Sequence, residues 1–282
     1  LETPLNLSDM KVMVDRKAEW NQIYYECWRQ MRDFFYDPNM HGVDWEGLKK
    51  NYATLLPYVN QRQDLTYIIG ELIGELNIGH AYVGGGDYVK ADRVNMGLLG
   101  ARLAKDPSGY YKITKIFKGQ NWDRVTRSPL TEIGVNAKEG DYIIAINGIK
   151  TSDVVNINQL LIATADKQVK LTLNSKPSEE GSRVVTVVPT NDEQKLIYYN
   201  WVEENYEKVN KATNGRVGYL HIPNMGSEGL NEFVKHFYAQ LSKEALIVDD
   251  RGNGGGNVSP HIIERLRREP VQVTLMRNSM PS

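Results

Sequence analysis

The stretch Ala245–Pro260, ALIVDDRGNGGGNVSP, decides how the rest of the chain is interpreted. It reads as a short apolar strand, Ala245–Val248, followed by polar residues, three successive glycines and the start of a helix. Ser259 is the expected N-cap of that helix, and Pro260 suits its first position. The sequence therefore predicts a strand, a glycine loop and a helix in direct succession.

The glycine run itself allows three interpretations. Gly254, Gly255 and Gly256 lack side chains, so their backbone N–H groups can lie close to a bound group. The N-terminus of the following helix favours negative charge. Such a loop can bind a phosphate, or it can hold the oxyanion of an acyl-transfer intermediate. A tight turn between strand and helix is the third possibility, and the run alone leaves all three open.

Composition places the chain among globular proteins. Its 282 residues are enough for roughly two domains, or for three small ones. The net charge of −1 argues against nucleic acid or an anionic membrane as the main partner. No apolar run reaches the roughly 18 residues of a transmembrane helix, and no segment has the pattern of a signal peptide. The single cysteine, Cys27, excludes an internal disulfide and leaves the compartment, cytoplasmic or periplasmic, undecided.

The first 90 residues are expected to form helices. Apolar residues recur at helical spacing over Asp15–Tyr36, and further helices are expected over Asp44–Leu56 and from about Asp64 to Leu76. His80 follows the third helix, in the run Gly79-His80-Ala81-Tyr82. A histidine in this place can act as a base, or it can be a capping or surface residue. The five histidines and one cysteine show no metal-binding spacing, so no metal site is predicted.

Residues 91–190 change to short strands separated by turn residues. The expected strands are Leu98–Leu103, Tyr111–Phe117, Tyr142–Ile146, Val169–Asn174 and Val184–Val188. The run Gly140–Gly148, GDYIIAING, combines a turn, a strand and an Asn-Gly turn, and Gly97–Gly100, GLLG, leads directly into another strand.

These two motifs resemble a PDZ domain of the bacterial, protease-associated kind. The resemblance implies that Gly97, Leu98, Leu99 and Gly100 form the loop that binds a peptide carboxylate, with a helix over Ile157–Ala163 as the other wall of the groove. Such a groove binds an extended peptide by adding it as a strand to the sheet edge. A purely structural hinge is the alternative.

Residues 191–282 alternate between helix and strand, which predicts a parallel sheet. The expected elements are helix Lys195–Lys211, strand Arg216–Ile222, helix Ser227–Leu241, strand Ala245–Val248, helix Pro260–Arg268 and strand Val271–Met276. Ligands of such sheets bind beyond the carboxyl ends of the strands, where the three glycines would lie. So few strands leave an open edge, and we expect this core to be incomplete.

The order of these features resembles the C-terminal half of tricorn-type proteases, in the serine peptidase family that also holds the C-terminal processing (tail-specific) proteases. The resemblance implies a multi-domain α+β chain with a helical cap in residues 1–90 and a PDZ-like β-sandwich or barrel in residues 91–190. The N-terminal part of an α/β, crotonase-like peptidase core would follow in residues 191–282. It further implies a peptidase that acts on oligopeptides or unfolded polypeptides without a cofactor, in a parent that forms a hexamer.

The resemblance also implies roles for individual residues. His80 would be the general base, and backbone N–H groups of Gly254 and Gly255 would help to form the oxyanion hole. The family has a serine before the histidine, where this chain has Gly79, so the base would need another orienting partner.

The nucleophile is the larger departure. The family places it in a Gly-Ser turn beyond the next strand, and Ser259, Ser279 and Ser282 lack that context. Since the chain also starts at Leu1, we expect a fragment that lacks its nucleophile and is inactive alone.

Two other functions stay open at this point. A non-catalytic peptide-binding scaffold with a degenerate peptidase core is the main alternative. Nucleotide binding at the glycine run is a weaker one, because the chain has no GxxxxGK[ST] motif and no GxGxxG that opens a helix.

Overall fold

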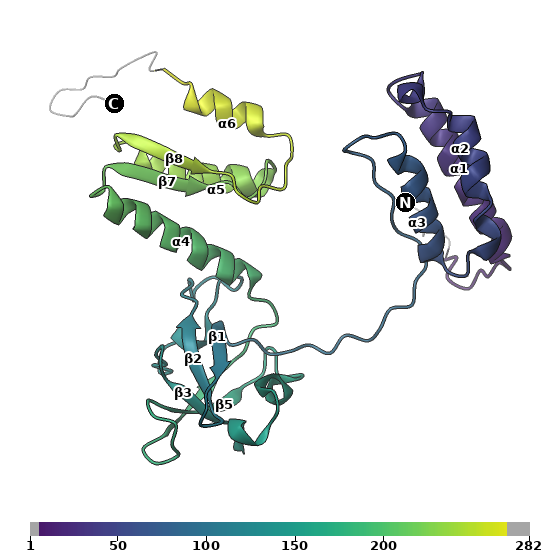
Figure 1. Ribbon diagram of the computed structural model, residues 1–282. Helices are drawn as coiled ribbons and strands as arrows, with labels where there is room; N and C mark the ends of the chain where they lie inside the picture. The colour runs from purple at the N-terminus through teal and green to yellow at the C-terminus, as the bar shows by residue number, and fades with distance from the viewer. Residues whose placement is uncertain (1–5, 270–282) are drawn as a thin grey trace. The chain divides into compact units, whose positions relative to one another are not determined.

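The computed structural model describes residues 6–269, in a chain that divides into two compact units, residues 1–92 and 93–282 (Figure 1). The first unit is helical, and the second combines an antiparallel sheet with helices around a parallel pair of strands. This is the multi-domain α+β class that the sequence predicts. The predicted strand Val271–Met276 and the serines Ser279 and Ser282 lie outside the described residues.

The first unit consists of three helices, α1 (Arg16–Phe34), α2 (Trp45–Ala53) and α3 (Arg62–Gly74). The helix starts are set by aspartates, because Asp15 accepts hydrogen bonds from the first turn of α1 and Asp44 does the same for α2. The apolar stripes of the helices meet in one core, whose largest buried members are Tyr24, Trp28, Trp45, Leu65, Ile69 and Leu72.

Two tryptophans satisfy each other's polar atoms inside that core. Trp28 Nε1 donates to the Trp45 carbonyl at 3.0 Å, and Trp45 Nε1 donates to the Trp28 carbonyl at 3.2 Å. This reciprocal pair ties α1 to the start of α2, since a buried indole N–H without an acceptor would cost free energy.

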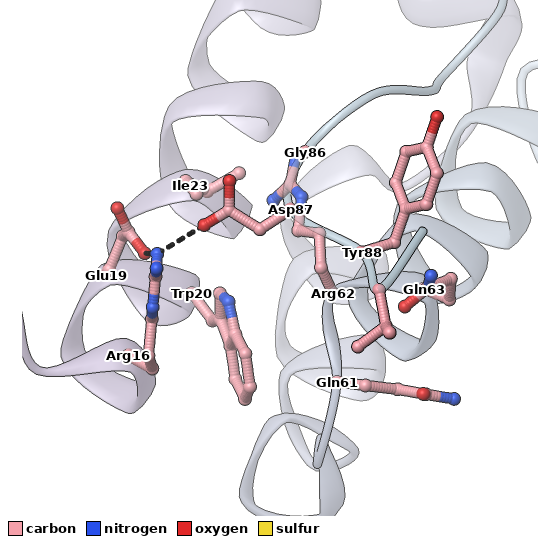
Figure 2. Close-up of a pocket in the computed structure, with 11 residues that line it drawn as sticks. Arg16, Glu19, Trp20, Ile23, Gln61, Arg62, Gln63, Gly86, Asp87 and Tyr88 are labelled. Atoms are coloured by element: carbon pink, nitrogen blue, oxygen red, sulfur yellow. Dashed lines mark hydrogen bonds and ion pairs between the residues drawn. The ribbon is translucent and has the colours of Figure 1, made fainter. Parts of the chain in front are cut away.

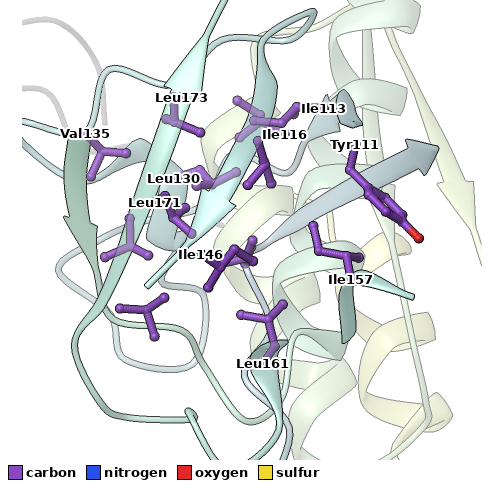
Figure 3. Packing of buried hydrophobic residues seen from close by; sticks show 14 residues of the cluster. Tyr111, Ile113, Ile116, Leu130, Val135, Ile146, Ile157, Leu161, Leu171 and Leu173 are labelled. Carbon is purple, nitrogen blue, oxygen red and sulfur yellow. The ribbon is translucent and has the colours of Figure 1, made fainter. Parts of the chain in front are cut away.

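The second unit begins with an antiparallel sheet of six strands in the order β1-β2-β3-β5-β6, with the short β4 paired to β3. The strands are β1 (Ala101–Lys105), β2 (Tyr111–Ile116), β3 (Tyr142–Ile146), β4 (Ile149–Lys150), β5 (Val169–Asn174) and β6 (Arg183–Val187). The sheet is open, with β1 at one edge, and its buried residues form the packed cluster of Figure 3.

Two predicted elements of this sheet region differ from the structure. The strand expected from Leu98 begins only at Ala101, because Leu98 bonds instead with Thr190 in both directions, at 2.7 and 2.9 Å. The helix expected over Ile157–Ala163 is a 3₁₀ helix that stops at Leu161, and Ala163 has a left-handed φ of +57°.

The remainder of the second unit alternates helix and strand as predicted. Its elements are α4 (Gln194–Ala212), β7 (Val217–His221), α5 (Ser227–Phe237), β8 (Ala245–Asp249) and α6 (Ser259–Leu266). Strands β7 and β8 are parallel, with His221 opposite Asp249. Their core contains Leu220, Ile222, Phe233 and Ile262.

Two helix ends in this region were predicted wrongly. The helix expected to reach Leu241 ends at Phe237 and continues as a 3₁₀ turn, because the side chain of Gln240 bonds to the N–H and carbonyl of Tyr219, each at 2.9 Å. Helix α6 starts at Ser259, so Val258 is its N-cap and Ser259 is not.

Candidate active site

The loop Gly254–Gly256 lies beyond the carboxyl end of β8 and is exposed to solvent. It is fastened to the segment that follows β7. Met225 donates its N–H to the Gly255 carbonyl at 2.7 Å and accepts from the Asn257 N–H at 2.8 Å. The ends of two neighbouring parallel strands are therefore joined at the position where such sheets bind their ligands.

The backbone N–H groups of the loop differ in what they bind. Gly254 donates to the Pro223 carbonyl at 3.0 Å, and Gly255 donates to Asn253 Oδ1 at 2.8 Å. The N–H of Gly256 has no hydrogen-bond partner among residues 93–269. Gly256 also has a φ of +139°, which a residue with a side chain rarely adopts. The two predicted oxyanion donors are thus engaged within the chain, whereas the N–H of the third glycine is unpaired as far as the described residues extend.

The turn before the loop is held by a buried carboxylate. Asp249 is 8% exposed and accepts hydrogen bonds from the Tyr219 hydroxyl at 2.7 Å and from Arg251 Nε at 2.9 Å. These bonds, above all those of Arg251, hold the pKa of Asp249 well below its usual range. The guanidinium of Arg251 also lies over the ring of Trp201, with 5.4 Å between its Cζ and the ring centroid.

A second buried group, His221, holds the same turn from β7. Its Nε2 lies 2.8 Å from the Arg251 carbonyl, so Nε2 carries the proton, and Nδ1 accepts from the Tyr198 hydroxyl at 2.9 Å. The ring is only 4% exposed and meets the edge of Trp201, with centroids 4.8 Å apart. Burial raises the pKa of Tyr198, so the tyrosine remains a hydroxyl donor. Helix α4 thereby orients the turn that carries the glycine loop.

Sequence reasoning missed this polar network. Tyr219 and His221 are two residues apart on β7, Asp249 is the last residue of β8, and Arg251 lies in the turn that follows it. Residues two apart in a strand share a face, so the spacing of Tyr219 and His221 on β7 was a usable signal, whereas Arg251 lies in a turn and strand alternation does not place it. The contribution of Tyr198 from α4 could not be read in this way.

His80 lies in the first unit, six residues after α3 ends at Gly74, and it is exposed. Within residues 6–92 its ring has no hydrogen-bond partner, and the nearest aromatic contact is Tyr82, with ring centroids 6.5 Å apart. By contrast, His41 has both ring nitrogens engaged, Nδ1 with the Leu76 carbonyl at 2.8 Å and Nε2 with the Tyr36 hydroxyl. His41 therefore fixes the chain just before His80 and is a structural residue.

The segment that follows His80 packs against α1 and the start of α3 (Figure 2). Asp87 forms an ion pair with Arg16 at 2.7 Å. Gly86, at a φ of +93°, lies so close to Arg62 that an added Cβ would be 2.2 Å from the Arg62 Nε. The segment borders a pocket of about 590 Å³. These contacts fix both sides of the stretch that presents His80.

The residues predicted to bind a peptide carboxylate use most of their N–H groups within the chain. Gly97 donates to the Leu161 carbonyl at 2.8 Å, and Leu98 donates to Thr190. Gly100 donates to a carboxylate oxygen of Glu193 at 3.1 Å. The side chain of Leu99 is 4% exposed and belongs to the core of the sheet.

Residues 6–269 contain no group of histidine, cysteine and carboxylate side chains arranged to hold a metal ion. In the same range, every helix is too short or too polar to cross a bilayer.

Comparison with known protein families matches three parts of the chain in order. Residues 16–74 match the tricorn protease C1 domain, residues 97–192 the tricorn protease PDZ domain, and residues 216–278 peptidase family S41. The last match begins at the residue before β7 and includes the glycine loop.

Individual relatives agree with these matches. The chain is 36% identical to tricorn protease homolog 1 of Streptomyces coelicolor, over 99% of this chain and 26% of the relative. It is 35% identical to the tricorn protease homolog of Saccharolobus solfataricus, over 98% of this chain and 25% of the relative. The crystal structure of the tricorn protease superimposes with a TM-score of 0.87 at 30% identity, over 98% of this chain and 27% of that chain.

The chain thus spans about a quarter of the length of these relatives. The order of the three matched regions, the fold of both units and the sequence identity along nearly the whole chain agree. The chain belongs to the tricorn-type proteins of peptidase family S41.

Proposed function

We propose that this chain supplies part of the active site of a serine peptidase that acts on oligopeptides or unfolded polypeptides. The observation that carries the proposal is the exposed Gly254–Gly256 loop, which is fastened at the carboxyl ends of β7 and β8 and has one N–H, that of Gly256, without a partner in residues 93–269. An anionic tetrahedral intermediate needs such fixed backbone donors.

His80 is the proposed general base, which takes the proton of the attacking serine hydroxyl. It is exposed, and its imidazole has no hydrogen-bond partner among residues 6–92. A base in this role needs a free nitrogen for the serine and a second partner for orientation. Because Gly79 carries no side chain, that second partner has to come from elsewhere in the protein.

Gly256 is the proposed first donor to the oxyanion, with Gly255 as the second. In the part of the second unit that the structure describes, the N–H of Gly256 has no partner, whereas that of Gly255 is bound to the side chain of Asn253, two residues earlier. A small rotation of Asn253 would release it. Removal of one oxyanion donor typically lowers kcat by about 100- to 1000-fold.

The nucleophile is proposed to be a serine outside these 282 residues. Ser259 is unsuitable because it occupies the first turn of α6. The relatives are about four times as long as this chain, which leaves ample sequence for the remaining catalytic residues. The exposed apolar side chains of Ile247 and Val248 on β8, 45% and 39% exposed, would then be covered by further peptidase core.

The PDZ-like sheet is proposed to bind peptide. The match of residues 97–192 to the tricorn protease PDZ domain supports this proposal. The hexamer implied by the resemblance stays a prediction, which analytical ultracentrifugation of the longer protein would measure. A scaffold without catalysis is the rival, and the peptidase assay distinguishes the two.

The test compares two proteins with the same fluorogenic peptide library. One is the 282-residue chain, and the other is a longer protein that contains this chain together with a complete S41 domain. We expect hydrolysis only from the longer protein. Hydrolysis by the 282-residue chain would contradict the proposed position of the nucleophile, and an inactive longer protein would favour the scaffold.

A further inference from the structure

One carboxylate of the chain already occupies the loop that was predicted to bind a peptide carboxylate. Glu193, the N-cap residue of α4, accepts the N–H of Gly100 at 3.1 Å. The N–H groups of Gly97 and Leu98 are not available to a carboxylate, since they donate to the carbonyls of Leu161 and Thr190.

Further residues of α4 dock beside this contact. Leu196 is 0% exposed and lies against Gly100 and Gly119, where added Cβ atoms would be 3.1 and 2.6 Å from its methyl groups. One turn later, Asn200 Oδ1 accepts the N–H of Lys118 at 2.9 Å. An acidic group followed by a buried apolar side chain thus sits on the loop, which is the combination that the C-terminus of a peptide would present.

The surroundings of Glu193 allow its carboxylate to be displaced from the Gly100 N–H. Burial raises the pKa of Glu193, while the Gly100 N–H and the nearby Arg102 counteract that rise. A partly buried carboxylate with one backbone hydrogen bond gives up little when another carboxylate replaces it.

Among residues 93–269, no strand pairs with the sheet edge next to this loop. β1 is the edge strand, and Gly100 immediately precedes it. An extended peptide that paired with β1 would bring its terminal carboxylate to the Gly100 N–H. It would compete there with Glu193.

We propose that Glu193 is an internal ligand of the PDZ-like loop, which the C-terminal carboxylate of a bound peptide displaces. The inference rests on the proposed peptide binding by the sheet and adds a means of regulation. Displacement loosens the N-terminal end of α4, and the same helix carries Tyr198, which bonds to His221 beneath the glycine loop. Peptide binding is thereby coupled to the turn that positions the candidate oxyanion donors.

The test uses the 282-residue chain and a labelled peptide that ends in an apolar residue with a free carboxylate. Fluorescence anisotropy measures its Kd for the wild type, Glu193→Ala, Glu193→Gln and the control Glu207→Gln, an exposed residue of the same helix. The amidated peptide serves as the ligand control. Nuclear magnetic resonance follows the Gly100 N–H in each variant.

We expect Glu193→Ala to bind the free-carboxylate peptide about ten-fold more tightly than the wild type, because the competing group is gone. Glu193→Gln should lie between them, since an amide oxygen still accepts the N–H, and Glu207→Gln should equal the wild type. The amidated peptide should bind weakly to all four. The Gly100 resonance should move in the Glu193 variants only.

Equal Kd values for Glu193→Ala and the wild type would overturn the proposal. A shifted Gly100 resonance without peptide binding by any variant would also overturn it, and would show that Glu193 is a permanent structural clamp. That second result would refute peptide binding at this loop and leave the peptidase proposal to its own assay.

Discussion

Substitution of Gly256 tests how the candidate oxyanion loop is held. In Gly256→Ala the new Cβ would lie 2.2 Å from the carbonyl oxygen of Met225 and 2.4 Å from its carbonyl carbon. Both are backbone atoms, so no side-chain rotation relieves the clash, and the φ of +139° is unfavourable for alanine. The variant must separate the loop from Met225 or adopt a new backbone conformation.

The cost can be added up from these contacts. Separation of the loop from Met225 breaks the hydrogen bonds of Met225 with Gly255, Asn257 and Val258, at about 1 kcal/mol each. A loop that keeps its conformation instead bears left-handed strain of about 1–3 kcal/mol together with the clash. We therefore expect a local destabilisation of about 3 kcal/mol. Gly254→Ala is the matched control, because nothing lies within 4 Å of its added Cβ and its φ is ordinary. That variant should change stability by less than about 0.5 kcal/mol.

Hydrogen exchange measured by mass spectrometry gives the local free energy of opening. Peptides that cover residues 217–266 should exchange about 100-fold faster in Gly256→Ala than in the wild type, while peptides from the first unit stay unchanged. Equal exchange in Gly256→Ala and Gly254→Ala would refute the argument that the loop is fastened to the segment after β7.

Three further substitutions test the packing around the loop. Asp249→Asn should lower the free energy of unfolding by about 2 kcal/mol at pH 7. Because folding lowers the pKa of Asp249, the ionised carboxylate stabilises the fold above its ordinary pKa, and this stabilisation is lost as pH falls through the folded pKa. The variant should therefore flatten the acid side of the Tm–pH curve. An unchanged acid side would contradict this role. Tyr198→Phe should cost about 1 kcal/mol and change the ring nitrogen shifts of His221, whereas unchanged shifts would mean that the two side chains do not bond in solution. Leu196→Ala should lower the free energy of unfolding in urea by about 3 kcal/mol, because Leu196 is buried. The control Leu241→Ala, at a residue that is 62% exposed, should lower it by less than about 0.5 kcal/mol. Similar losses in the two variants would show that α4 is not docked through Leu196.

Periodicity in the sequence predicted nearly every helix and strand of the described chain. It succeeded because each helix or strand buries one face, as in α1 with its Asp15 cap and β3 with its buried isoleucines. Element ends were less predictable, because they depend on partners distant in sequence. The end of α5 is set by Gln240 bonding to Tyr219, which no local pattern shows.

The position of the candidate glycine loop could be predicted from the sequence, but the hydrogen-bond partners that hold it could not. Glycine content and position after a strand pointed to the loop Gly254–Gly256, and the resemblance to tricorn-type proteases assigned the oxyanion role to Gly254 and Gly255. Neither showed that the N–H groups of these two residues are engaged, while that of Gly256 has no partner within residues 93–269. Likewise the motif at Gly97–Gly100 predicted a carboxylate-binding loop, yet its carboxylate comes from Glu193, 93 residues further along the chain. Such pairings follow from tertiary packing alone.

The role of His80 is the central claim, and the kinetics of one variant test it most directly. In a longer protein with this chain and a complete S41 domain, kcat for peptide hydrolysis is measured for the wild type, His80→Ala and the exposed control His261→Ala. We predict that His80→Ala loses about 100- to 10,000-fold in kcat with little change in KM, and that His261→Ala keeps full activity. A His80→Ala protein that retains the wild-type kcat would contradict the account.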